Sequence, residues 1–225
     1  MHCHIGSTIK ETVVFKDAAK IMVKFVEEIR AEGFNLEYLN LGGGLGIDYE
    51  HKGDNVIPTP IDLLNEIRDL ILQMNLKLII EPGRSIVGNT CIFVNKVTGV
   101  KSNGNKNFVV VDGSMSEMIR PSLYDAYHHI ELAEPNTNNK EGTYDVVGPV
   151  CESADFLGKQ RVMHQPEEGD CLVVYDAGAY CQSMSSVYNL KLTCAEYWVE
   201  STNLTQIRKP LELETYLTQF DCNEA

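Results

Sequence analysis

The segment 36–46, LEYLNLGGGLG, runs from a short apolar stretch directly into a cluster of glycines. Its first part, 36–41, predicts a buried strand. The glycines that follow it are Gly42, Gly43, Gly44 and Gly46. At the carboxyl end of a parallel strand, bare backbone amides of this kind bind phosphate groups in barrel and doubly wound folds. A tight strand-to-helix turn without a ligand has the same composition, so the cluster alone leaves both interpretations open.

The chain around this segment alternates between helix and strand. Apolar residues recur at helical spacing over 16–32 and 60–73, and LKLII at 76–80 predicts a second strand. Strands separated by helices indicate parallel pairing with crossover helices. The first helix is expected to bury Ala19, Met22, Val23, Phe25 and Val26.

The second strand also ends in a loop with polar side chains, Glu81-Pro82-Gly83-Arg84. A surface ion pair is the commoner use of a Glu and an Arg in such a turn. Two successive strands that both end in ligand-like loops favour a binding function more than either loop does alone.

Beyond about residue 90 the helical spacing disappears. Short segments rich in β-forming residues, broken by Gly, Asn and Asp, predict strands at 92–100, 107–112, 144–150 and 170–174. We therefore expect a mostly antiparallel sheet domain in the second part of the chain, with a boundary between residues 84 and 91.

Composition narrows the possible partners. The 225 residues carry a net charge of −13, which argues against nucleic acid or an anionic membrane as partner and favours small-molecule chemistry. There is no apolar run long enough to cross a bilayer. The seven cysteines show no CxxC spacing, so we expect no zinc site and interpret most of them as buried thiols in a reducing compartment.

Six motifs carry a resemblance to a known family. In chain order they are HIGS, LNLGGGLGIDY, EPGRSIVG, GSMSEMIRPSLYDAYHHIEL, VVGPVCESADFLG and DAGAYCQSMSSVYN. Together they resemble the alanine-racemase-like, fold-type III family of pyridoxal-phosphate enzymes, most closely the branch that decarboxylates meso-2,6-diaminopimelate to lysine. The resemblance implies an α/β part at 1–88, the carboxyl-terminal portion of a (β/α)8 TIM barrel, followed by a mostly antiparallel β domain at 89–225.

The resemblance also implies pyridoxal 5'-phosphate as cofactor and assigns residues to it. His4 is expected to stack on the cofactor ring, and Glu81 to face its pyridine nitrogen. Without the motifs, a core histidine and a solvated glutamate would be the ordinary interpretations. Tyr180 is expected to touch both the phosphate and the substrate, although a tyrosine in a sheet domain usually only packs. The implied phosphate cradle comprises Ser7, Gly43, Gly44, Gly46, Gly83 and Arg84.

The substrate side is implied in the same way. Arg120 and Tyr124, with Arg84, are expected to hold the distal carboxylate of diaminopimelate, because a planar guanidinium binds a carboxylate with two parallel hydrogen bonds. Glu152 is expected to receive the distal amino group. Cys151, by itself most simply a small buried hydrophobe, matches the family's proton donor. In this family the Cys-Glu-Ser segment reaches the other subunit's site, so the resemblance implies a homodimer with shared active sites.

The family's Schiff-base lysine precedes the HIGS motif. The resemblance therefore predicts that the chain is a carboxyl-terminal portion without this lysine and has little activity alone. A non-catalytic homologue or partner subunit, and a related decarboxylase with another substrate, stay open as alternatives. The expected location is the cytoplasm, or the plastid stroma if the source is a plant or an alga.

Overall fold

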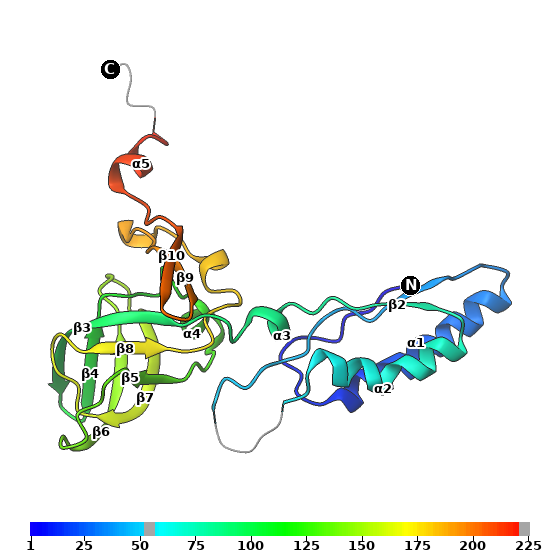
Figure 1. The fold of residues 1–225 in the computed structure, drawn as a ribbon, viewed down its shortest axis with the longest axis horizontal. Helices are drawn as coiled ribbons and strands as arrows, with labels where there is room; N and C mark the ends of the chain where they lie inside the picture. Colours follow the sequence, from blue (N-terminus) through cyan, green and yellow to red (C-terminus); the bar gives the residue numbers. More distant parts are fainter. Residues whose placement is uncertain (52–56, 221–225) are drawn as a thin grey trace. The chain divides into compact units, whose positions relative to one another are not determined.

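The computed structural model describes residues 1–51 and 57–220 (Figure 1). These residues form two compact units: unit 1 contains the described residues of Met1–Ile92 with Tyr175–Ala179, and unit 2 contains Phe93–Val174 with the described residues from Tyr180 onward. The sequence pattern predicts a boundary between residues 84 and 91, and the family resemblance implies one at 88/89. In the structure the boundary follows residue 92, and the five residues 175–179 belong to unit 1.

Unit 1 is a parallel strand pair with helices. Its elements are α1 (Thr12–Ala31), β1 (Tyr38–Asn40), α2 (Pro60–Gln73), β2 (Lys77–Ile79) and the short α3 (Arg84–Val87). Strands β1 and β2 pair in parallel, with Leu39 opposite Leu78, as the alternation of helix and strand predicts. Helix α2 begins at its predicted residue because Thr59 and Asp62 form a capping box and proline occupies the first turn.

The core of unit 1 lies where α1 and α2 pack side by side, as Figure 1 shows. Helix α1 buries Phe15, Ala19, Val23 and Val26. The prediction that Phe25 joins this stripe is wrong, since its side chain is 47 % exposed. At 100° per residue, position 25 lies about 200° from position 23 and so falls on the opposite face of the helix.

Unit 2 is built on a six-stranded sheet with the order β5-β8-β3-β4-β6-β7. The strands are β3 (Phe93–Asn103), β4 (Lys106–Val111), β5 (Ile130–Leu132), β6 (Glu141–Val147), β7 (Phe156–His164) and β8 (Cys171–Val174). All neighbours pair antiparallel except β4 and β6, so the mostly antiparallel prediction is confirmed. The sheet curls so that its edge strands β5 and β7 approach each other. Their closeness is visible at Gly158 on β7, where an added Cβ would overlap the Ile130 side chain on β5.

Shorter elements complete unit 2. They are α4 (Arg120–Tyr124), η1 (Gln182–Met184), η2 (Tyr188–Leu190), β9 (Glu196–Glu200), β10 (Asn203–Arg208) and α5 (Leu213–Leu217). Strands β9 and β10 form a separate antiparallel hairpin. Within the described ranges, no helix has the length and apolar character that a membrane crossing requires.

The cysteines differ from their expected burial. Among the six that the structure describes, only Cys181 is buried, Cys3 and Cys194 are intermediate, and the exposed ones are Cys91, Cys151 and Cys171. The prediction that most are buried is therefore wrong for the described part of the chain. Cys222 lies outside the described residues.

Candidate active site

Three segments of unit 1 lie side by side beyond the carboxyl ends of β1 and β2. The Glu81 amide donates to the carbonyl of Gly42 at 2.9 Å, which continues the parallel pairing past the strands. The amino-terminal segment joins from the other side, since the Ile9 amide donates to Gly44 O at 2.9 Å and the Gly46 amide to Ile9 O at 2.8 Å. The HIGS, GGGLG and EPGR motifs thus meet at one edge of unit 1.

Gly43 and Gly44 at this edge have no room for side chains. A Cβ on Gly43 would overlap the carbonyl oxygen of Glu81, and one on Gly44 would overlap the carbonyl oxygen of Gly6. Gly44 also has a φ of +112°, a conformation that L-residues with side chains rarely adopt. The backbone therefore requires glycine here, and the loop keeps the bare amides that a phosphate cradle needs.

Arg84 connects the EPGR loop to the HIGS motif. Its Nη2 donates to the hydroxyl of Ser7 at 3.4 Å, and its Nη1 donates to the phenol of Tyr49. Gly83 precedes it as the N-cap of α3. The cation is thus held beside the serine and the glycine loop, where it complements an anion.

His4 and Glu81 lie at the same edge. The Nδ1 of His4 is 2.9 Å from the position that a Cβ on Gly42 would take, so the imidazole borders the glycine turn. The Glu81 carboxylate accepts a hydrogen bond of 2.6 Å from Nδ2 of Asn40, whose Oδ1 accepts from the Gly42 amide at 2.8 Å. Sequence reasoning missed Asn40, although an asparagine near the end of an apolar strand, two residues before a glycine run, is a recognisable signal.

A second missed pair lies in unit 1. His51 Nε2 is 2.7 Å from Oδ2 of Asp176, a carboxylate that is 3 % exposed. The pair borders a cavity of about 420 Å³ that is also lined by Asp48, Ser85 and Asn89. The Asp176 segment is held in unit 1 by hydrogen bonds from the Ala177 amide to Cys91 O and from the Gly178 amide to Gly88 O, at 2.8 and 3.0 Å.

The remaining candidate residues belong to unit 2. Glu152 Oε2 accepts a hydrogen bond of 3.0 Å from the phenol of Tyr188, and Oε1 accepts one of 3.1 Å from the Ala154 amide. The Ala154 amide, followed by the Tyr188 phenol, lowers the pKa of Glu152 below its ordinary value. Both side chains line a mostly apolar cavity of about 530 Å³. Glu152 is therefore held in the charged form that an ammonium group would pair with.

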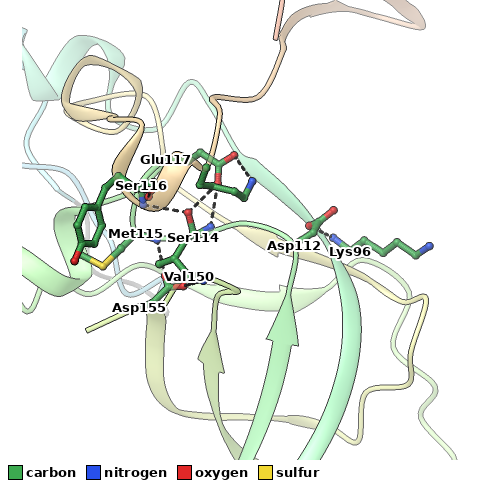
Figure 2. A network of polar contacts seen from close by, with 10 residues as sticks. Lys96, Asp112, Ser114, Met115, Ser116, Glu117, Val150 and Asp155 are labelled. Atoms are coloured by element: carbon green, nitrogen blue, oxygen red, sulfur yellow. Dashed lines mark hydrogen bonds and ion pairs between the residues drawn. The ribbon is translucent and has the colours of Figure 1, made fainter. Parts of the chain in front are cut away.

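The loop that carries Cys151 and Glu152 is closed by Asp155. Its carboxylate accepts hydrogen bonds from the Met115 amide at 2.7 Å and the Val150 amide at 2.8 Å, as Figure 2 shows. Burial is the largest influence on its pKa, which is raised above the ordinary value despite these two donors. Cys151 itself is exposed.

The same network contains a buried glutamate. Glu117 accepts from the amide and the hydroxyl of Ser114 at 3.0 and 3.2 Å (Figure 2). Its other oxygen pairs with Lys191 at 3.0 Å. A fully partnered carboxylate of this kind fixes the turn before α4. Neither Glu117 nor Lys191 was expected from sequence, because charged residues are usually exposed.

Arg120, Tyr124 and Tyr180 differ in their surroundings. Arg120 begins α4 and is buried, with its Nη1 2.6 Å from Nε2 of the buried His128. Tyr124, at the end of the same short helix, is 62 % exposed. Tyr180 is also exposed and has a φ of +62°, an uncommon conformation for a residue with a side chain. The expected cofactor residues thus lie in unit 1, except for Tyr180, which belongs to unit 2. The expected substrate residues lie in unit 2, except for Arg84, which belongs to unit 1.

Comparison with known proteins identifies the family. Residues 12–178 match the family described as pyridoxal-dependent decarboxylase, C-terminal sheet domain. The chain belongs to this decarboxylase family. It is 61 % identical over 98 % of its length to a probable chloroplastic diaminopimelate decarboxylase of Oryza sativa subsp. japonica, covering 45 % of that protein. It is 42 % identical over 93 % of its length to diaminopimelate decarboxylase of Aquifex aeolicus, covering 49 % of it.

Solved structures agree with this family. A crystal structure from Aquifex aeolicus matches with a TM-score of 0.90 and 40 % identity, over 98 % of this chain and 54 % of that one. A diaminopimelate decarboxylase from M. jannaschii in complex with L-lysine matches with a TM-score of 0.89 and 33 % identity, over 97 % and 50 %. The chain spans about half the length of the curated relatives it matches.

For a pyridoxal-dependent decarboxylase, the edge of unit 1 has suitable chemistry for the cofactor. The cofactor phosphate requires amide donors, a hydroxyl and a cation, and the glycine loop, Ser7 and Arg84 supply these at one edge. Gly43 and Gly44 add no side chain to this edge, because a Cβ on either would overlap a backbone carbonyl oxygen. The residues present therefore fit the group.

Proposed function

We propose that this protein catalyses the pyridoxal-phosphate-dependent decarboxylation of meso-2,6-diaminopimelate to L-lysine and carbon dioxide. The observation that carries the proposal is the meeting of Ser7, the glycine loop and Arg84 at the edge where β1 and β2 end. The 61 % identical rice relative, named a probable diaminopimelate decarboxylase, supports the choice of substrate.

In this proposal the edge of unit 1 holds the cofactor. Ser7, Gly43, Gly44, Gly46, Gly83 and Arg84 bind its phosphate. His4 stacks on its ring, and the Glu81 carboxylate, held by Asn40, keeps a proton on its pyridine nitrogen. When bound, pyridoxal phosphate supplies an electron sink for the bonding pair that the departing carbon dioxide leaves behind.

The residues of unit 2 handle the substrate. Arg120 and Tyr124, with Arg84 from unit 1 as a third contact, bind the distal carboxylate, while Glu152 pairs with the distal ammonium group. Tyr180 contacts both the cofactor phosphate and the substrate. The lowered pKa of Glu152 supports this role, because the carboxylate stays charged at neutral pH. The Cys151 thiol gives its proton to the carbon that has lost the carboxylate. Selection of a substrate with a zwitterion at each end follows from these two charge pairs.

Two structural proposals accompany the activity. Unit 1 is the carboxyl-terminal portion of a TIM barrel, which the parallel pairing of β1 and β2 and their crossover helix support. The protein works as a homodimer in which the exposed Cys151 segment completes the partner's site.

The location of the protein is proposed from its source. The chloroplastic rice relative supports the plastid stroma in a plant or an alga, and the cytoplasm is proposed for other sources.

A substrate panel tests the function. The full-length protein, loaded with pyridoxal phosphate, is incubated with meso-diaminopimelate, ornithine or lysine, and carbon dioxide release is measured. We expect release from meso-diaminopimelate at least about a hundredfold faster than from the other two, because each lacks the distal carboxylate that Arg120 pairs with. Faster turnover of ornithine or lysine would identify a related decarboxylase instead, and cofactor binding without turnover of any of the three would identify a non-catalytic homologue.

A further inference from the structure

A buried guanidinium and a buried imidazole meet in unit 2. Arg120, at the start of α4, is 5 % exposed, and His128, just before β5, is 0 % exposed. Their Nη1 and Nε2 atoms are 2.6 Å apart. The chain reverses between them at Asp125, which has a φ of +51° and ends α4, and the Ala126 amide donates back to Arg120 O at 3.4 Å.

The chemistry of this pair assigns its protons. A guanidinium has only N–H donors, so the hydrogen bond requires a lone pair on Nε2 of His128. The imidazole is then neutral and carries its proton on Nδ1. A protonated ring would turn an N–H toward the guanidinium and place two cations together in a buried site, which is costly.

The hydrogen bond also restricts Arg120. A carboxylate is bound with two parallel bonds only when the plane of the guanidinium has the correct orientation. An arginine side chain has many rotamers, and one fixed partner on Nη1 removes most of them before the ligand arrives. The exposed Tyr124, four residues later on α4, lies at the solvent end of the same helix.

We propose that His128 is a positioning residue that, as a neutral acceptor at Nε2, orients the Arg120 guanidinium for the distal carboxylate of the substrate. The proposal rests on the proposed function, since it needs Arg120 to bind that carboxylate. It assigns His128 a part in substrate selection without contact to the reacting atoms.

Kinetics of the full-length, cofactor-loaded protein test the role. The variants are H128L, which removes the acceptor, H128Q, whose amide oxygen retains one at a similar reach, and H129Q as a control at the neighbouring, partly exposed histidine. We expect H128L to raise KM for meso-diaminopimelate roughly tenfold or more with a smaller change in kcat, and H128Q to stay within about threefold of the wild type. A folded H128L variant with wild-type KM would overturn the proposal, and so would an H128Q variant as defective as H128L.

A second measurement does not depend on activity. Nitrogen-15 NMR of selectively histidine-labelled full-length protein reports which ring nitrogen carries the proton. We expect His128 to show a protonated Nδ1 and a bare Nε2 at neutral pH, and an imidazolium or a protonated Nε2 would contradict the pairing even if H128L does not fold. If the wild type fails to turn over meso-diaminopimelate while His128 shows the expected proton on Nδ1, the proposed function fails and the pairing with Arg120 stands.

Discussion

The phenol of Tyr188 donates a hydrogen bond of 3.0 Å to Oε2 of Glu152. The contact joins the Cys-Glu-Ser loop to the segment that follows the DAGAY motif, 36 residues later in the chain. After the Ala154 amide, the phenol is the next largest cause of the lowered pKa of Glu152, and the carboxylate in turn raises the pKa of Tyr188. Tyr188 thereby favours the charged carboxylate that Glu152 needs for its proposed role as the partner of an ammonium group.

Replacing Tyr188 by Phe is expected to raise the pKa of Glu152, because one of its donors is lost while the Ala154 amide remains. Carboxyl NMR titration of the two proteins measures this shift. A folded-state pKa below the unfolded value means that Glu152 stabilises the fold above the unfolded pKa, and that this contribution is lost as pH falls through the folded pKa. The acid-dependent loss should be smaller in the variant. Tyr197→Phe, in the exposed β9 hairpin, is the matched control, and an unchanged Glu152 titration in Tyr188→Phe would contradict the assignment.

Replacing Gly44 by Ala is expected to weaken pyridoxal phosphate binding by about tenfold or more. The added Cβ would overlap Gly6 O, and the φ of +112° is strained for alanine, so the loop must shift away from the HIGS motif. Fluorescence titration with pyridoxal phosphate gives the dissociation constant. Gly99→Ala on β3 is the control, since a Cβ there meets nothing within 4 Å. Equal cofactor affinity in the two variants would contradict the proposal that the glycine loop binds the cofactor phosphate.

The glycine loop could be predicted from the sequence, whereas the contacts that support it could not. Helical spacing and turn residues are local, so they located α2 and the ends of β1 and β2 closely. Helix α1 begins four residues before the predicted start, since Phe15 and the turn around it pack into the same core. Partners such as Asn40 with Glu81 depend on which strands are neighbours, and no local pattern contains that information.

Unit 2 was harder to predict for the same reason. Strand β5 has only three residues, too few for an alternating pattern, and β7 contains Gly158, which interrupts one. The contact of Asp155 with the Met115 amide joins segments that are 40 residues apart in the chain. The motif resemblance supplied residue roles, but the pairs that support those residues became visible only in the folded chain.

Replacing Asn40 by Ala is expected to destabilise unit 1 by about 1–2 kcal/mol, because both the Gly42 amide and the Glu81 carboxylate lose a hydrogen-bond partner. Denaturant unfolding with and without pyridoxal phosphate measures the loss. Asn40→Asp separates the two contacts, since it keeps the acceptor for Gly42 and places a second carboxylate against Glu81. We expect the cofactor-dependent stabilisation to fall in both variants. Asn65→Ala, on the exposed face of α2, should leave it unchanged.

Replacing Asp155 by Asn is expected to destabilise unit 2 by about 1–3 kcal/mol at neutral pH, since the amide group retains one acceptor oxygen and turns an N–H₂ toward the amide of Met115 or Val150. The loop that carries Cys151 and Glu152 then loses one of the two hydrogen bonds that Asp155 accepts, and kcat is expected to fall as well. Asp69→Asn, on the exposed face of α2, is the control.

The pH dependence of the Asp155→Asn effect has a definite sign. Burial raises the folded-state pKa of Asp155 above its unfolded value, so protonation favours the folded state. Its contribution to stability is therefore fully present below the unfolded pKa and is lost as pH rises through the folded pKa. The asparagine variant lacks this titration, and its deficit relative to the wild type should be larger near pH 4 than near pH 7, as unfolding free energies across that range will measure. A deficit that instead grows with pH would mean that the two amide donors outweigh burial and that the folded-state pKa of Asp155 is lowered.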